Sequence, residues 1–71
     1  MKLHYYPDTD SLYIELKPAD STETLEVAEG ILIDMDAEGA VVGFDIDHAS
    51  KHLDLSTLET VALPLRSTKI A

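Results

Sequence analysis

The chain has 71 residues, with 14 acidic against 5 basic side chains and a formal net charge of -9 at pH 7. Such a charge repels phosphates and argues against nucleic-acid binding, and no apolar run is long enough to span a membrane. There is no cysteine, so disulfides and thiolate zinc sites are excluded, which fits a reducing cytoplasm. A secretory signal peptide begins with basic residues followed by an apolar run, and the sequence does not have this pattern, so we expect no such signal. We expect one small cytoplasmic domain over residues 1–71, with residues 66–71 frayed.

The first elements along the chain read as a β-hairpin. Residues 2–6 and 11–17 alternate apolar and polar side chains, a period of two that is typical of strands with one buried face. Between them, residues 7–10 (Pro-Asp-Thr-Asp) have the composition of a turn. A loop over residues 18–21 follows. A weaker alternation over residues 24–28 then predicts a third strand, with Gly30 as either a turn or a kink into the next strand.

Residues 31–47 predict the central hairpin, around which the rest of the chain is organised. Apolar alternation runs before and after Asp36-Ala37-Glu38-Gly39, and a glycine in this position readily adopts the positive φ of a tight turn. Gly43 lies inside the second strand of this hairpin. A glycine there indicates a bulge or the close approach of another group.

After the central hairpin, Asp47 is placed to cap a short helix over residues 48–53. Alternation over residues 61–65 predicts a last strand, which Pro64 confines to an edge. The predicted fold is α+β, a small antiparallel β-meander of four to five strands with one short helix after the central hairpin. Because so short a chain buries only about 60% of its unfolded surface, we expect a homo-oligomer, most simply a homodimer.

The order of these motifs resembles a small, mainly bacterial family, domain-of-unknown-function family 2283. Residues 6–14 (Tyr-Pro-Asp-Thr-Asp-Ser-Leu-Tyr-Ile) are similar to its opening, Tyr-Asp-x-x-x-Asp-x-Leu-Tyr-Ile, although Pro7 stands where the family usually has Asp. The similarity continues through residues 26–31, 33–36, 39–46 and 49–53, and so covers about residues 5–53. The resemblance implies no established activity. By gene context, some members resemble the second component of toxin–antitoxin-like pairs.

Three sets of residues are candidate functional sites. The first is an acidic, partly apolar surface that could face a protein partner, made of Tyr13, Leu32, Asp34, Asp36, Val41, Asp45 and Asp47. The second follows the spacing that opens an EF-hand calcium loop, although strands rather than helices flank it; its ligands would be Asp34, Asp36, Glu38 and Asp45. The third is a histidine pair four residues apart, a spacing that suits a transition metal on a helix: His48 and His52.

We assign no catalytic residue and no cofactor, because the chain has no nucleophile motif and no phosphate-binding glycine loop. The leading hypothesis is a non-enzymatic protein-interaction module, antitoxin-like, that holds a basic protein partner through its acidic surface. The alternatives are a calcium- or cation-binding domain and, ranked last, a small hydrolase. The acidic charge could also serve solubility alone.

Overall fold

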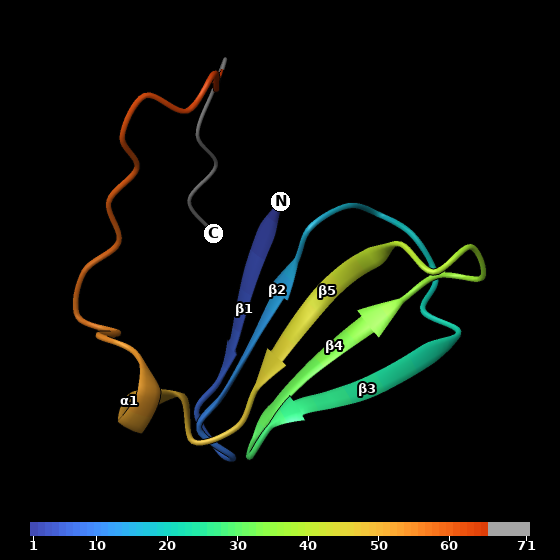
Figure 1. Cartoon of the computed structure of the whole chain (residues 1–71). Coiled ribbons are helices and arrows are strands. Elements are labelled where there is room, and N and C mark those ends of the chain that lie inside the picture. The colour runs from blue at the N-terminus through green and yellow to red at the C-terminus, as the bar shows by residue number, and fades with distance from the viewer. Residues whose placement is uncertain (66–71) are drawn as a thin grey trace.

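The computed structural model describes residues 1–65, which form five strands and one short helix (Figure 1). The α+β class and the position of the helix after the central hairpin are as predicted, and the prediction for residues 66–71 lies outside the described residues. The elements are β1 (Lys2–Tyr6), β2 (Ser11–Glu15), β3 (Glu23–Ala28), β4 (Ile31–Met35), β5 (Val41–Ile46) and α1 (Ala49–His52).

The five strands form one antiparallel sheet in the order β1-β2-β5-β4-β3. The prediction of a simple meander was therefore wrong. After β2, residues 16–22 carry the chain to the far edge of the sheet, and β5 then returns to lie beside β2 (Figure 1). Strands β2 to β5 thus have the Greek-key order, in which a long connection brings a strand back beside a three-stranded meander.

Two glycines make the turns of the β3–β4–β5 meander. Gly30 has a φ of 76° and, with Glu29, joins β3 directly to β4. The structure therefore has a turn at Gly30 and not a kink in one long strand. Gly39 has a φ of 84° in the β4–β5 turn, as the sequence predicted. Positive φ favours glycine because the residue has no Cβ to clash with the backbone.

The register divides the sheet into two chemically different faces, because paired residues share a face and neighbours along a strand alternate. The apolar face carries Leu3, Tyr5, Leu12, Ile14, Leu25, Ile31, Ile33, Phe44 and Ile46. The polar face carries Tyr13, Glu15, Glu26, Leu32, Asp34, Gly43 and Asp45. Among the described residues, the buried hydrophobic side chains are Leu12, Val42, Ile46 and Ala49.

The segment after β5 differs from the prediction in two ways. Helix α1 begins after His48, which has a left-handed backbone (φ 50°) and no side-chain cap, so the prediction of Asp47 as N-cap was wrong. The predicted last strand over residues 61–65 was also wrong, because residues 53–65 run beside the sheet without forming a strand (Figure 1). Pro64 lacks a backbone donor and Ala62 has a φ of 60°, and both disfavour strand pairing. Within residues 1–65, no helix is long and apolar enough to cross a membrane.

Candidate functional site on the polar face

A hydrogen-bonded chain of side chains crosses the polar face from one strand to the next. The Tyr13 hydroxyl, on β2, donates to Asp34 Oδ2 on β4 at 3.0 Å. The Thr24 hydroxyl, on β3, donates to Asp34 Oδ1 at 2.7 Å. Both oxygens of Asp34 are therefore held by neighbouring side chains. Partial burial and the nearby Asp34 carboxylate raise the pKa of Tyr13, so its hydroxyl stays a donor at neutral pH.

Gly43 makes this arrangement possible, because the Tyr13 ring lies across the β5 backbone at this residue. A Cβ at position 43 would overlap the Tyr13 hydroxyl and lie 2.7 Å from its Cζ. It would also lie 3.1 Å from the carbonyl oxygen of Ile14. The sequence predicted a bulge or a close approach at Gly43, and the structure has both, because the register shifts beside it between Asp34 and Met35.

Asp45 is the carboxylate on this face whose environment is least favourable to a negative charge. It pairs with Tyr13 on one side and Leu32 on the other. Its pKa is raised, first by partial burial and then by the negative charges of Asp47 and Asp34. In the described part of the chain, the one ion pair joins Lys17 Nζ to Asp36 Oδ2 at 3.7 Å, at the end of the hairpin. The Asp34–Asp45 region therefore has no counter-ion from residues 1–65.

Replacing Asp45 with Asn should stabilise the free protein at neutral pH by about 0.5 kcal/mol, the size of a partly exposed charge interaction. A carboxyl whose pKa is raised by folding stabilises the fold while it is protonated, and that stability is lost as pH rises through the folded-state pKa. The gain from Asn should therefore disappear below the unfolded pKa of about 3.9. Urea unfolding followed by circular dichroism at pH 7 and at pH 3.5 would measure it. Asp8→Asn, in the exposed first turn, removes the same charge and should show a smaller gain; equal gains would contradict the argument.

The other two candidate aspartates lie at opposite ends of the central hairpin. Asp36 follows β4, and its Oδ1 accepts the backbone N–H groups of Glu38 and Ala40, each at 2.9 Å. These bonds, and then the charge of Lys17, lower the pKa of Asp36. Asp47 follows β5, where its backbone N–H donates to the Gly30 carbonyl at 2.7 Å. The structure thus brings Asp47 near Asp45 but uses Asp36 to close the turn.

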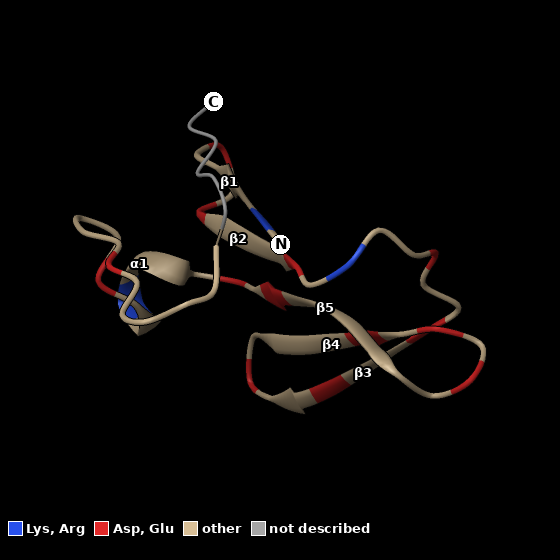
Figure 2. Cartoon of the chain, turned by 90° about the horizontal axis from the view of Figure 1, so that it is seen from above, with Lys and Arg blue, Asp and Glu red and all other residues tan. Residues whose placement is uncertain are grey.

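The two apolar members of the candidate surface are placed differently from each other. Leu32 pairs with Asp45 and with Glu26 and lies half-buried on the polar face between them. The bulge shifts the register between Asp34 and Met35, so Val41 pairs with Met35. Val41 therefore does not continue the alternation that places Asp34 and Gly43 on the polar face. The compact part of the candidate surface is therefore the group around Tyr13, Leu32, Asp34 and Asp45, which we call the acidic centre. Its aspartates lie on β4 and β5, with Glu26 on the neighbouring β3 (Figure 2).

The residues of the EF-hand-like candidate site do not converge on one point, and the two histidines of the other site have no third ligand within residues 1–65. Asp34 is held by Tyr13 and Thr24, and Asp36 is folded into its own turn. Within residues 1–65, no group of three or more His, Cys, Asp or Glu side chains is arranged to hold a metal ion. His48 and His52 line a small depression with Glu29, Gly30 and Lys51. The cation-binding and hydrolase hypotheses stay predictions, which metal titration and activity assays would test.

Asp10 has a structural role that the sequence analysis missed. It lies in the β1–β2 turn, and its carboxylate accepts the Ser50 hydroxyl at 2.6 Å and the Tyr5 hydroxyl at 2.8 Å. Its backbone carbonyl accepts the N–H of Ala49 at 2.8 Å. The pKa of Asp10 is lowered, first by the hydrogen bond from Ser50 and then by that from Tyr5. Asp10 therefore ties the start of α1 to the sheet, in place of the local cap predicted at Asp47.

The comparisons with known proteins bear on the family and not on the activity. A family model described as "Protein of unknown function (DUF2283)" matches residues 2–50, in agreement with the predicted resemblance over about residues 5–53. No curated protein and no solved structure matches the chain. The matched range covers all five strands and the start of α1. Since it spans more than half of the 71 residues, the chain belongs to this family of proteins of unknown function.

Proposed function

We propose that this protein is a non-enzymatic interaction module that holds a basic protein partner on its polar face, in the manner of an antitoxin-like component. The observation that carries the proposal is the acidic centre, where Asp45 is partly buried near Asp34 and Asp47 without a cation from the described residues. A Lys or Arg from a partner would supply the missing opposite charge. It would also draw the pKa of Asp45 back down, because an opposite charge favours the ionised form.

The shape of the acidic centre also suits a protein partner. Tyr13 and Leu32 give it an apolar component beside the two carboxylates, and the Tyr13–Asp34–Thr24 hydrogen bonds fix the position of Asp34. Tyrosine is common in interfaces because it combines a large apolar surface with a polar end. The carboxylates would speed association with a basic partner and select against acidic ones, while the burial of the apolar groups would supply most of the affinity.

The test compares two variants that each lose two negative charges. A partner is first captured from lysate of the source organism at low salt and purified, and its binding is then measured by calorimetry. The Asp34→Asn/Asp45→Asn variant should bind about tenfold more weakly, as two partly exposed ion pairs of about 0.7 kcal/mol each would give. The matched control is Asp8→Asn/Asp20→Asn, which changes exposed loop residues away from the strands. It should bind within about twofold of the unmodified protein.

Salt dependence provides a second measurement on the same proteins. Binding of the unmodified chain should weaken as salt rises, and the Asp34→Asn/Asp45→Asn variant should show a shallower dependence, because salt screens exposed charges. If that variant binds as tightly as the control at every salt concentration, the acidic centre does not hold the partner and the proposal is wrong.

A further inference from the structure

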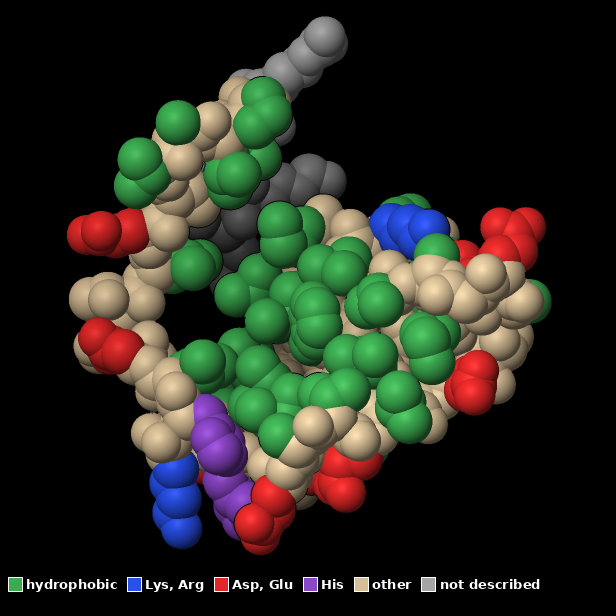
Figure 3. Space-filling view, in the orientation of Figure 1, with side chains coloured by type: hydrophobic (Ala, Val, Ile, Leu, Met, Phe, Trp, Pro, Cys, Tyr) green, Lys and Arg blue, Asp and Glu red, His purple; other side chains and the backbone are tan. Residues whose placement is uncertain are grey.

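The apolar face of the sheet is largely open over its β3–β4 half. Leu25, on the edge strand β3, is 50% exposed, and Val27, at the bulge of the same strand, is 54% exposed. Ile33 and Phe44, further into the same face, are only partly buried. Figure 3 shows hydrophobic side chains gathered over this face of the sheet, and the acidic side chains that are visible in this view lie around them, at the edge of the molecule.

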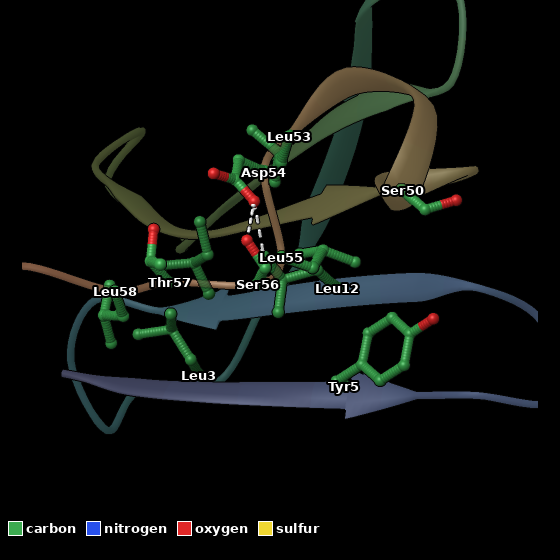
Figure 4. Close-up of a pocket in the computed structure, with 11 residues that line it drawn as sticks. Leu3, Tyr5, Leu12, Ser50, Leu53, Asp54, Leu55, Ser56, Thr57 and Leu58 are labelled. Atoms are coloured by element: carbon green, nitrogen blue, oxygen red, sulfur yellow. Dashed lines mark hydrogen bonds between the residues drawn. The ribbon is translucent and has the colours of Figure 1, made fainter.

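The described C-terminal segment covers only the other half of this face, and covers it loosely. Leu55 and Leu58 stand over Leu3 and Leu12 of β1 and β2 across an apolar hollow of about 900 Å³ (Figure 4). No residue of β3 or β4 lines this hollow, so the hollow does not extend over that half of the face. A sheet with one apolar face needs a second layer to bury that face, and residues 1–65 do not supply a complete one.

The accessible surface of the chain is also larger than that of a compact monomer of the same mass. A compact protein of 7.8 kDa is expected to expose about 4,400 Å². This chain exposes 5846 Å², about 1,400 Å² more. The open apolar face and the extended C-terminal segment both contribute to that excess. A standard stable interface buries about 800 Å² on each partner, so the excess is large enough to supply one.

The distribution of charge indicates which molecule fits this face. Four acidic side chains of the strands, Glu15, Glu26, Asp34 and Asp45, lie on the opposite, polar face, whereas one, Glu23 at the start of β3, has the register of the apolar face. Two copies that pack their apolar faces together would keep these carboxylates on their outer surfaces. Sheets packed in this way lie about 10 Å apart, as in other β-sandwiches. The net charge of -9 would therefore oppose self-association much less through this face than through the polar one.

We propose that a second copy of this chain packs on the apolar face, so that the protein in solution is a sandwich of two identical sheets. The inference does not rest on the proposed function, because it concerns the opposite face of the sheet. Both acidic centres would stay accessible on the outside of the dimer.

The experiment measures molar mass by sedimentation equilibrium for the full chain and two variants, over about 10 to 500 µM. The unmodified protein should have about twice the chain mass of 7.8 kDa. Leu25→Lys places a charge in the proposed interface twice, since a two-fold dimer uses the same patch on both copies. It should raise the dimer dissociation constant about a hundredfold. Leu25 is half exposed in the isolated chain, so this variant should still fold, as circular dichroism would show.

The matched control is Glu26→Lys, which introduces the same residue one position along β3 but on the polar face. It should leave the dissociation constant within about twofold. A second measurement needs no variant: the melting temperature of the unmodified protein should rise with its concentration, as it does when folding and dimerisation are coupled. A monomer at all concentrations, or a dimer that Leu25→Lys leaves intact, would overturn the proposal.

Discussion

Replacing Gly43 with Ala should lower the free energy of unfolding by about 2 kcal/mol, although the change adds a single methyl group. The backbone of Gly43 does not have a positive φ, so what the site requires is space. A Cβ there overlaps the Tyr13 hydroxyl and lies close to the Ile14 carbonyl, so the ring must move. Once the ring has moved, its hydrogen bond to Asp34 is lost. Urea unfolding followed by circular dichroism measures the change.

A double-mutant cycle separates this cause from a general intolerance of the strand. In a Tyr13→Ala background the ring is absent, so adding Gly43→Ala should cost much less, because only the 3.1 Å contact of the new Cβ with the Ile14 carbonyl remains. The two single changes should therefore be strongly non-additive. Tyr13→Phe, which removes only the hydroxyl, should cost about 1 kcal/mol. If Gly43→Ala is equally destabilising with and without the Tyr13 ring, the contact is not the reason for the glycine.

Replacing Leu12 with Ala should destabilise the fold by about 3 kcal/mol. Leu12 is 6% exposed and packs with Ile46 and Ala49, at the point where β2, β5 and α1 meet. A core of this size supplies only about 3–5 kcal/mol in total. The variant should therefore be largely unfolded at room temperature. Circular dichroism and urea unfolding at a fixed protein concentration would show this.

Val61→Ala provides the control for the Leu12 prediction. It also removes methyl groups from an apolar residue, but Val61 is 84% exposed in the C-terminal segment. Its effect should stay within about 0.5 kcal/mol. If Leu12→Ala were no more harmful than Val61→Ala, the small cluster at the junction of β2, β5 and α1 would not be the core of the domain.

The same strands contribute side chains to both proposed interactions, one on each face of the sheet. On β4, Ile33 lies on the apolar face and Asp34 on the polar face. The proposed dimer uses the first face and the proposed partner uses the second, so a change on one face should leave the other interaction in place. The family match supports neither proposal, since the family has no assigned function.

The sequence alone was enough to predict strands over residues 2–6, 11–17 and 24–28, the central hairpin over residues 31–47, the turn at Gly39 and the family. These features depend on local patterns: side-chain alternation has a period of two, and glycine is the residue that most readily adopts a positive φ. The special character of Gly43 was also readable, because a glycine inside a strand is unusual. The partner of that glycine was not, since Tyr13 lies far from it in the chain.

Only the tertiary structure decided the strand order, and with it the composition of the acidic centre. Alternation tells which face of a strand is apolar but not which strand lies beside it, so the place of β5 between β2 and β4 could not be predicted. That order brings Tyr13 to Asp34 across 21 positions of sequence and Ser50 to Asp10 across 40. Such contacts join segments that are far apart in the sequence but are neighbours in the fold, so local patterns in the sequence do not predict them. For the same reason, the sequence placed the cap of α1 at the adjacent Asp47, while the structure anchors the helix through the distant Asp10.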